Sequence, residues 1–451
     1  LYYQKANFYR RRLCTMIWAK EETLPREEIE AIQLSKLKDT VRYIYDRVQP
    51  YRAKMDAAGV KPQDINTLED LKKLPFTYKT DFRDNYPDGL FAVDKKEIVR
   101  YHASSGTTGK PTVVGYTRND LDMWLNNVAR LACMGGATAD DVAQISFGYG
   151  TFTGALGLHG GLEKIGASVI PMSSGNTNKQ IMFLQDMGVT LLVATPSYAL
   201  HLGEEIRRRG LDPEKDLKLH IGLFGGEGMT EAMRDEMHKV WGENFLCTQN
   251  YGMSELCGPG VAGECPELCG MHVNEDWFIP EIINPETEEV LPPGELGELV
   301  VTCLGKEALP LVRYRTGDLT RLMYEPCKCG RTTVRMENIS GRADDMLVIR
   351  GVNVFPTQIE EVLLKIEEIG PHYEILVERK NRLDVMTITV ELVDDRLLDS
   401  YTKLSELESR IKRALKSQLG LATQIRLVAP NTLQRFEGKA RRVTDLRKDG
   451  L

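Results

Sequence analysis

Long hydrophobic runs are absent from this sequence of 451 residues. No apolar stretch approaches the about 20 residues that a helix needs to cross a bilayer. The segment at residues 1–20, LYYQKANFYRRRLCTMIWAK, is interrupted by charged side chains and lacks the pattern of a secretory signal peptide. These absences lead us to expect a cytoplasmic protein with no membrane partner.

An excess of positive charge is absent as well. The sequence has 58 Lys and Arg against 65 Asp and Glu, which gives a formal net charge of −7 at pH 7. Because nucleic acids and anionic membranes are bound through basic surfaces, we expect no nucleic-acid partner. A polyanionic ligand would have to be held by a local group of donors.

The nine cysteines do not suggest a disulfide framework. Such frameworks are typical of small secreted domains, whereas a reducing compartment keeps thiols free. Four cysteines are scattered and are typical of small buried side chains: Cys14, Cys133, Cys247 and Cys303. The other five lie close together in the sequence and need a separate explanation: Cys257, Cys265, Cys269, Cys327 and Cys329.

Internal repeats and low-complexity tracts are absent too, and the chain instead alternates strand and helix patterns. After a mostly helical lead-in over residues 1–80, short apolar runs predict buried strands at 141–147, 167–172, 190–196 and 219–227. Helical patterns occupy 118–134, 178–188 and 196–210, and a β-rich stretch covers 276–304. This order predicts an α/β fold, with a large domain over residues 1–340 that binds ligands at the carboxyl ends of its strands.

A smaller α+β domain is expected over residues 341–451. Thr357 and Glu360 predict a helix-capping box, and the helix that follows has an apolar face: Ile359, Val362, Leu363 and Ile366. A hairpin that turns at residues 380–382, a helix over 404–420 and a strand over 424–428 complete this domain.

The segment YHASSGTTGKP at residues 101–111 combines hydroxyl side chains, glycines and one lysine. A polyphosphate needs several donors at once, and glycines let the backbone approach it closely. The spacing differs from the P-loop motif, because Gly106 and Gly109 lie three residues apart and Pro111 follows Lys110. Taken alone, the segment is also compatible with a Ser/Gly-rich surface turn.

Five further motifs follow in order: FGGEGM (224–229), QNYGMSE (249–255), YRTGD (314–318), GRADDMLVIRGVNVFPTQIEE (341–361) and FEGKARR (436–442). With the loop, they make the sequence resemble the adenylate-forming superfamily of acyl- and aryl-CoA synthetases, carrier-protein adenylation domains and luciferases. The wording KEALPLVRYRTGDLTRL and IRGVNVFPTQIEE is similar to its phenylacetate-CoA ligase branch. The resemblance runs from near residue 10 to the end of the chain.

The resemblance implies an enzyme that uses ATP, Mg²⁺ and coenzyme A. The carboxylate of an aryl acid would attack the α-phosphate of ATP and release pyrophosphate, and the thiol of coenzyme A would then displace AMP. Charge spreads over phosphate oxygens in the first transition state, so catalysis depends on positioning and positive charge. Two alternatives stay open: an adenylation enzyme that loads a carrier protein, and a non-catalytic zinc-containing protein that binds acyl-nucleotides. A homodimer is also left open.

The resemblance implies which residues bind the nucleotide. The loop would hold the β- and γ-phosphates through Ser104, Ser105, Gly106, Thr107, Thr108, Gly109 and Lys110. Glu255 would bring Mg²⁺ to the phosphates, since this ion prefers oxygen ligands. The other implied nucleotide-binding residues are Gly225, Gly226, Glu227, Tyr251, Gly252, Met253, Ser254, Asp318, Arg342 and, more weakly, Arg335. Most relatives have Thr where this chain has Met253, which puts one phosphate contact in doubt.

Three residues near the end of the chain have implied roles in the two half-reactions. Lys439 would bridge the substrate carboxylate and the α-phosphate, because an ammonium can neutralise both anions. Without the other motifs, it would be interpreted as one more surface lysine of a basic tail. Asp344 matches the hinge about which the small domain rotates, and Gly351 would let the arm of coenzyme A pass close to the backbone.

Aromatic residues and glycines alternate in SFGYGTFTGALGLHGG, residues 146–161. The resemblance places the wall of the aryl pocket here, formed by Phe147, Tyr149 and Phe152. Each aromatic could equally be part of a core strand–loop–helix connection. The branch often has Tyr in place of Phe147, so another arylacetate or aryl acid stays open beside phenylacetate.

The clustered cysteines suggest a structural zinc site, because thiolates and imidazole are the ligands of tetrahedral zinc. Relatives with a C-x-C segment pair it with Cys and His, which implies Cys265, His272, Cys327 and Cys329 as ligands and leaves Cys269 spare. The alternative is a set of buried thiols with no metal. A catalytic zinc is not expected, because the sequence has no zincin motif.

Overall fold

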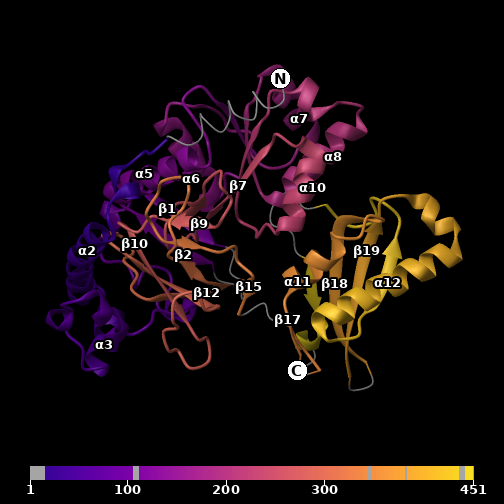
Figure 1. Ribbon diagram of the computed structural model, residues 1–451. Helices are drawn as coiled ribbons and strands as arrows, with labels where there is room; N and C mark the ends of the chain where they lie inside the picture. The colour runs from indigo at the N-terminus through magenta and orange to yellow at the C-terminus, as the bar shows by residue number, and fades with distance from the viewer. Residues whose placement is uncertain are drawn as a thin grey trace. The chain divides into compact units, whose positions relative to one another are not determined.

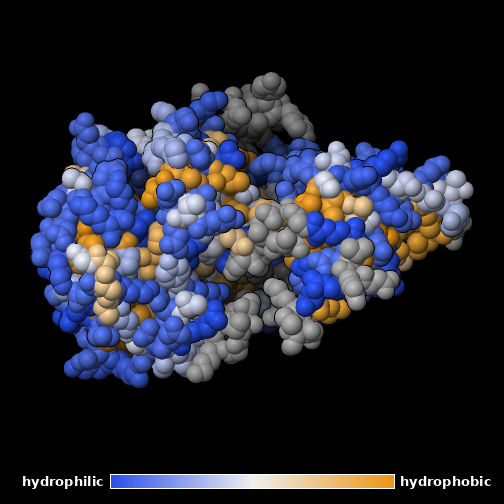
Figure 2. Space-filling view, turned by 90° about the horizontal axis from the view of Figure 1, so that it is seen from below, coloured by the Kyte–Doolittle hydropathy of each residue, from blue (hydrophilic) through white to orange (hydrophobic). Residues whose placement is uncertain are grey.

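The computed structural model describes residues 16–104, 111–343, 347–350, 352–380, 383–435 and 442–449. The chain divides into two compact units. Unit 1 comprises residues 1–195, 214–226 and 244–338, and unit 2 comprises residues 196–213, 227–243 and 339–451. None of the described helices is long and apolar enough to cross a membrane. On the face drawn in Figure 2, hydrophilic residues predominate and hydrophobic residues form smaller patches.

A nine-stranded sheet is the centre of unit 1. Its strands lie in the order β13 (Leu322–Met323), β14 (Arg335–Met336), β9 (Met271–Val273), β8 (Ala262–Glu264), β7 (Leu246–Tyr251), β6 (Ile221–Phe224), β5 (Leu191–Ala194), β3 (Val142–Ile145) and β4 (Ser168–Ile170). The five strands from β7 to β4 are parallel, and the others pair antiparallel. The central parallel strands β5 and β6 are continuous apolar runs in which every residue is buried, as expected for strands that are covered on both faces.

Helices α5 (Arg118–Met134) and α6 (Thr153–Lys164) pack against each other in unit 1 (Figure 1). A Cβ on Gly161 of α6 would lie 2.4 Å from Cγ1 of Val128, so glycine allows this close approach. The start of α5 is fixed by a capping box: Asp120 N donates to Thr117 Oγ1 at 3.1 Å, and Thr117 N donates to Asp120 Oδ2 at 3.0 Å.

Further elements of unit 1 surround this core. The hairpin strands β1 (Arg100–Ser104) and β2 (Thr112–Tyr116) pair antiparallel, as do β10 (Phe278–Ile283), β11 (Gly297–Cys303) and β12 (Tyr314–Thr320). The remaining α-helices are α2 (Arg26–Arg47), α3 (Gln49–Ala57), α4 (Lys79–Asp84) and α7 (Thr177–Asp186). Short 3-10 helices occupy Lys20–Thr23, Pro62–Asp64, Leu68–Lys73 and Lys95–Glu97.

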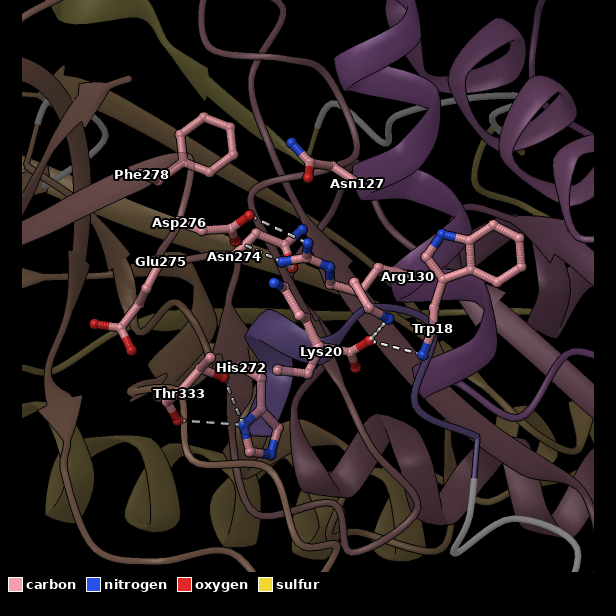
Figure 3. A network of polar contacts seen from close by, with 12 residues as sticks. Trp18, Lys20, Asn127, Arg130, His272, Asn274, Glu275, Asp276, Phe278 and Thr333 are labelled. Carbon is pink, nitrogen blue, oxygen red and sulfur yellow. Dashed lines mark hydrogen bonds and ion pairs between the residues drawn. The ribbon is translucent and has the colours of Figure 1, made fainter. Parts of the chain in front are cut away.

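Polar contacts attach helices α2 and α5 to the loop that precedes β10. Gln33 Nε2 donates to the carbonyl of Glu275 at 2.9 Å, and Lys36 Nζ donates to that of Asp276 at 2.7 Å. Figure 3 shows Arg130 of α5 directed at Asp276, with Nη1 2.6 Å from Oδ1. These contacts join segments that are far apart in the sequence.

In unit 2, α8 (Pro196–Arg208) packs on α10 (Glu231–Trp241), with Trp241 Nε1 donating to the carbonyl of Ala199 at 3.2 Å. The C-terminal part is a four-stranded sheet in the order β20 (Gln424–Val428), β19 (Leu383–Leu392), β18 (Ile369–Lys380) and β21 (Val443–Asp445). Helices α11 (Pro356–Leu363) and α12 (Tyr401–Leu419) cover it around one apolar core (Figure 1). Shorter elements of unit 2 are β15 (Gly341–Arg342), β16 (Leu347–Ile349), β17 (Val352–Val354) and the 3-10 helices Asp395–Asp399 and Leu446–Asp449, while α9 (Pro213–Asp216) begins at the last residue of a unit 2 segment and continues into unit 1.

The α/β fold class, the helix at 118–134 and the hairpin of the small domain are confirmed. The predicted capping box of Thr357 and Glu360 is wrong. The helix begins earlier, at Pro356, and Phe355 N donates to Gln358 Oε1 at 3.0 Å. Glu360 is instead buried in an ion pair with Arg442. Part of the predicted turn, residues 381–382, lies outside the described residues.

Candidate active site

Several predicted site residues lie outside the described residues. They are the loop residues Ser105, Gly106, Thr107, Thr108, Gly109 and Lys110, the hinge residue Asp344, Gly351 and the proposed catalytic Lys439. Ser104, which precedes the loop, is the last residue of β1 and pairs with Thr112 of β2. The roles of this group stay predictions.

A tight turn follows β7 and contains the motif YGMSE. The carbonyl of Met253 accepts hydrogen bonds from the amides of the residues three, four and five positions later, at 3.0, 3.1 and 2.6 Å. A Cβ on Gly252 would lie 1.4 Å from the carbonyl oxygen of Gly258, so only glycine fits there. Ser254 Oγ lies 3.2 Å from Thr153 Oγ1 at the start of α6. The turn therefore holds Glu255 on a compact backbone.

The motifs YGMSE (251–255) and YRTGD (314–318) are in contact in unit 1, although their last residues are 63 positions apart in the sequence. Tyr251 Oη donates to Asp318 Oδ2 at 2.6 Å, and both side chains are buried. The amide of Asp318 also donates to Thr316 Oγ1 at 3.0 Å. The structure thus brings together the residues predicted to bracket the adenine and to accept the ribose hydroxyls.

Glu255 is a buried carboxylate, with 2% of its surface exposed. Tyr314 Oη donates to Glu255 Oε1 at 3.4 Å. Burial raises the pKa of Glu255, and the charges of Lys79 and Lys306 oppose this shift. A buried carboxylate that is ionised is stabilised by a nearby cation. Because Mg²⁺ prefers oxygen ligands, the Glu255 carboxylate suits this ion.

The motif FGGEGM follows β6. A Cβ on Gly225 would lie 2.7 Å from Asn250 Oδ1, and Asn250 Nδ2 donates to the carbonyl of Phe224 at 2.8 Å. Gly226 has a φ of 79°, which favours glycine. Glu227 belongs to unit 2, where Ser197 Oγ donates to its carboxylate at 2.7 Å.

The predicted acyl-pocket residues differ in exposure. Phe147 is 6% exposed and Phe152 43% exposed, and their ring centroids are 6.3 Å apart. Phe147 Cε1 lies 3.7 Å from where a Cβ of Gly226 would stand, which places this ring beside the FGGEGM motif. Tyr149 Oη is 2.9 Å from Nδ1 of His159, and burial raises the pKa of this tyrosine.

His159 was not predicted from the sequence, and its Nε2 lies 3.0 Å from Glu163 Oε1. The spacing of four residues on a helix could have indicated this pair. Lys306 was also missed as a separate residue, although it lies within a segment that carries the resemblance. It is 1% exposed, and its Nζ donates to the carbonyl of Glu255 at 2.9 Å.

The four predicted zinc ligands lie together. Their donor atoms are all within 4.8 Å of one another, and all four residues are buried: Cys265, His272, Cys327 and Cys329. His272 Nε2 is 3.4 Å from Cys329 Sγ. Its Nδ1 lies 3.2 Å from Thr333 Oγ1 and 3.3 Å from the carbonyl of Thr333, as Figure 3 shows. This arrangement leaves Nε2 for a metal and fits a tetrahedral zinc ion.

Cys269 and Arg335 lie at the edge of this cluster. Cys269 is exposed, and its Sγ is 3.6 Å from Cys327 Sγ. Arg335 Nη1 lies 2.9 Å from Cys269 Sγ, and Nη2 donates to the carbonyl of Glu325 at 2.8 Å. These contacts associate Arg335 with the cysteine segment. Arg342, in β15, belongs to unit 2.

Comparisons with known proteins match both parts of the chain. Residues 15–303 match the family described as AMP-binding enzyme, and residues 351–447 match the AMP-binding enzyme C-terminal domain. The chain is 49% identical to the phenylacetate-coenzyme A ligase of Thermus thermophilus, over 95% of this chain and 98% of that protein. It is 47% identical to the Escherichia coli protein of the same name, over 94% and 97%.

Among solved structures, the chain is similar to 2-hydroxyisobutyryl-CoA ligase in the postadenylation state in complex with 2-HIB-AMP. The TM-score is 0.89 with 27% identity, and the match covers 95% of this chain and 92% of that one. The anthranilate CoA ligase AuaEII, at 15% identity and a TM-score of 0.58, shares the fold.

Proposed function

We propose that the acid joined by this enzyme is phenylacetate or a close arylacetate. The chain belongs to the AMP-binding enzyme family. It is an ATP-dependent ligase that joins an aryl carboxylic acid to coenzyme A with formation of AMP. The observation that carries this proposal is the 46–49% identity to four phenylacetate-coenzyme A ligases over 94–95% of the chain. ATP, coenzyme A and the acid are small molecules that are handled in the cytoplasm, where we place the enzyme.

In the first half-reaction, the acid carboxylate attacks the α-phosphate of ATP. We assign Asp318 to the ribose hydroxyls, because its buried carboxylate already accepts a hydrogen bond from Tyr251 Oη. The glycines after β6 line the adenine. Glu255 would hold Mg²⁺, which neutralises charge on the phosphates when bound. Lys439 would lie between the two reacting anions, where its ammonium lowers their repulsion.

In the second half-reaction, the thiol of coenzyme A attacks the acyl carbon and AMP leaves. Asp344 would act as the hinge between the two steps, and Gly351 would face the pantetheine arm. Phe147 and Phe152 support an aromatic acid, since their ring centroids lie 6.3 Å apart and the Phe147 ring lies beside Gly226 of the FGGEGM motif.

We also propose a structural Zn²⁺ held by Cys265, His272, Cys327 and Cys329. The proposal is supported by four buried donors within 4.8 Å of one another and by the contact of His272 Nδ1 with Thr333. The ion would fix the loop after β8 and the C-x-C segment, and it would take no part in the reaction.

The substrate is tested by pyrophosphate release with a panel of aryl and aliphatic acids. Phenylacetate should give the largest kcat/KM, and AMP release should depend on coenzyme A. A preference for a non-aromatic acid would contradict the arylacetate proposal. AMP release that requires a carrier protein in place of coenzyme A would favour the carrier-loading alternative.

The role of Lys439 is tested by separating the half-reactions. Lys439→Ala should nearly abolish acyl-AMP formation from ATP while it leaves thioester formation from presynthesised acyl-AMP largely intact, because the lysine acts only on the first pair of anions. Equal loss of both steps would overturn the assignment. Lys412→Ala on the exposed side of α12 is the control, and both rates should be retained.

A further inference from the structure

Two side chains hold three consecutive carbonyls of the turn that contains Glu255. Tyr116 Oη donates to the carbonyl of Ser254 at 3.2 Å. Lys306 Nζ donates to the carbonyls of Glu255 and Leu256, each at 2.9 Å. The backbone on both sides of the Glu255 side chain is therefore fixed from within the protein.

Lys306 is itself placed by the start of helix α5. Asp120 Oδ1 accepts from the amide of Glu307 at 2.7 Å, and Oδ2 accepts from the amide of Ala308 at 2.9 Å. Thr117 Oγ1 donates to the carboxylate of Glu307 at 2.6 Å. The residues immediately after Lys306 are thus hydrogen-bonded to the start of α5, where the Asp120 side chain is buried with 1% of its surface exposed.

Tyr116 is equally constrained. Its ring stacks on Trp124 with centroids 5.0 Å apart, and the ring of His102 meets it edge-on at 5.6 Å. Lys306 Nζ lies 4.8 Å from the centroid of the Tyr116 ring. The ammonium therefore has two carbonyls and one aromatic face around it, which together replace part of its lost hydration.

Burial of a lysine side chain at this position costs free energy, because its charge loses contact with water. Lys306 is 1% exposed, and lysine is almost never fully buried unless it is paired. A neutral side chain could fill the same volume, whereas a cationic donor orients carbonyls strongly and adds positive potential where phosphates would bind. One of the two carbonyls belongs to Glu255, the residue that would hold Mg²⁺, and the other to its neighbour Leu256, which points to the reaction rather than to stability alone.

We propose that Lys306 is a positioning residue for adenylate formation, which acts with Tyr116 by fixing the backbone of Ser254–Leu256 so that the Glu255 carboxylate meets Mg²⁺–ATP. This rests on the proposed function, because it assumes that Glu255 serves the metal. Lys306 would not touch the substrate. It would act through the turn, as residues that orient metal ligands do.

The test uses the full chain with three substitutions: Lys306→Met, Lys306→Arg and Tyr116→Phe. In Lys306→Met, the Mg²⁺ concentration that half-saturates pyrophosphate release should rise about 10- to 100-fold, the usual effect of losing a residue that orients a metal ligand. Tyr116→Phe should shift it in the same direction by less, since one carbonyl contact is lost. Lys306→Arg, which keeps the charge, should recover part of the loss.

A second measurement does not depend on turnover. Binding of Mn²⁺ in the presence of α,β-methylene-ATP, followed by electron paramagnetic resonance, should weaken by a similar factor in Lys306→Met. Thioester formation from presynthesised acyl-AMP should be unchanged, because that step follows the departure of pyrophosphate.

Lys36→Met is the matched control. Lys36 Nζ also donates to a backbone carbonyl, that of Asp276 at 2.7 Å, and also lies over an aromatic ring, that of Trp277 at 3.3 Å. This variant should keep the wild-type Mg²⁺ requirement. If Lys306→Met does not fold, the Lys306→Arg and Tyr116→Phe variants decide the question by the same measurements.

The outcomes separate this inference from the proposed function. A folded Lys306→Met or Tyr116→Phe variant with an unchanged Mg²⁺ requirement and unchanged Mn²⁺ binding would overturn the positioning role while leaving the ligase intact. Equal loss of the thioester step would also overturn it. Failure of the wild-type chain to release pyrophosphate with any aryl acid would instead refute the proposed function.

Discussion

At the scale of single residues, the hydrogen bond between Tyr251 and Asp318 joins two motifs of the proposed nucleotide site. The hydroxyl lies 2.6 Å from the carboxylate, and neither side chain is more than 9% exposed. A carboxylate held in this way keeps a fixed direction, which it needs if one group is to accept from two ribose hydroxyls.

We therefore expect Tyr251→Phe to raise the KM for ATP about tenfold, which corresponds to about 1.4 kcal/mol and to the loss of one hydrogen bond to a charged group. Steady-state pyrophosphate release at varied ATP measures it. Tyr51→Phe is the control, because Tyr51 Oη donates to the carbonyl of Pro75 at 2.7 Å in a different part of unit 1. A Tyr251→Phe enzyme with the wild-type KM would argue against the ribose assignment.

Individual residues also show the limit of sequence reasoning. Tyr251, Glu255 and Asp318 could be named as candidates because each lies in a family motif, and the structure brings Tyr251 and Asp318 into contact, while their roles stay predictions. The importance of Lys306 could not be predicted, since it depends on contacts with carbonyls of residues 255 and 256 that only the fold brings within reach. Arg335, the weaker of the two arginine candidates for the nucleotide site, donates to the carbonyls of Cys269 and Glu325, and its role stays a prediction.

At the scale of elements, local sequence rules predicted much of the fold. The helix at 118–134 was predicted from its helical pattern alone, and the structure adds the capping box of Thr117 and Asp120 that fixes its start. Four of the five parallel strands, β6, β5, β3 and β4, were predicted because they lie in short apolar runs, whereas β7, with Thr248, Gln249 and Asn250, was not. The predicted start of α11 was wrong. Pro356 occupies the first helical position, so the N-cap residue is Phe355 and not Thr357.

The loop after β8 and the C-x-C segment form an element that we propose depends on zinc. Cys327→Ser should lower the zinc content well below one ion per chain, because three ligands hold zinc less well than four. Cys269→Ser is the matched control and should retain the ion, since the exposed Cys269 is not among the four mutually close donors. Elemental analysis of the purified proteins gives both values, and equal zinc in the two variants would refute the ligand set.

At the scale of the whole molecule, the first described residues are attached to a segment more than 300 positions away. Arg331 Nε donates to Glu22 Oε2 at 2.6 Å, and Arg331 Nη2 donates to the carbonyl of Met16 at 2.7 Å. Glu22 and Arg331 are both buried, and Glu22 Oε1 also accepts from the amides of Trp18 and Ala19. The ion pair thus attaches the N-terminal segment to the C-x-C region.

Arg331→Met should lower the free energy of unfolding by about 3–5 kcal/mol, because it leaves the Glu22 carboxylate buried without its partner. Denaturant titration followed by far-UV circular dichroism measures this loss. Arg410→Met, which removes an exposed ion pair with Glu368, should have a much smaller effect. Should the two variants prove equally stable, the Glu22–Arg331 pair would not be the main attachment of the N-terminal segment.

Asp120 has a consequence beyond the end of its own helix. Its two oxygens accept from the amides of Thr117, Glu307 and Ala308, so one carboxylate sets both where α5 begins and where Lys306 stands. In a screen of random substitutions for lost activity, we would anticipate a vulnerable position here, in a residue that no substrate reaches. Inhibitor design or directed evolution confined to the immediate surroundings of the nucleotide would overlook it.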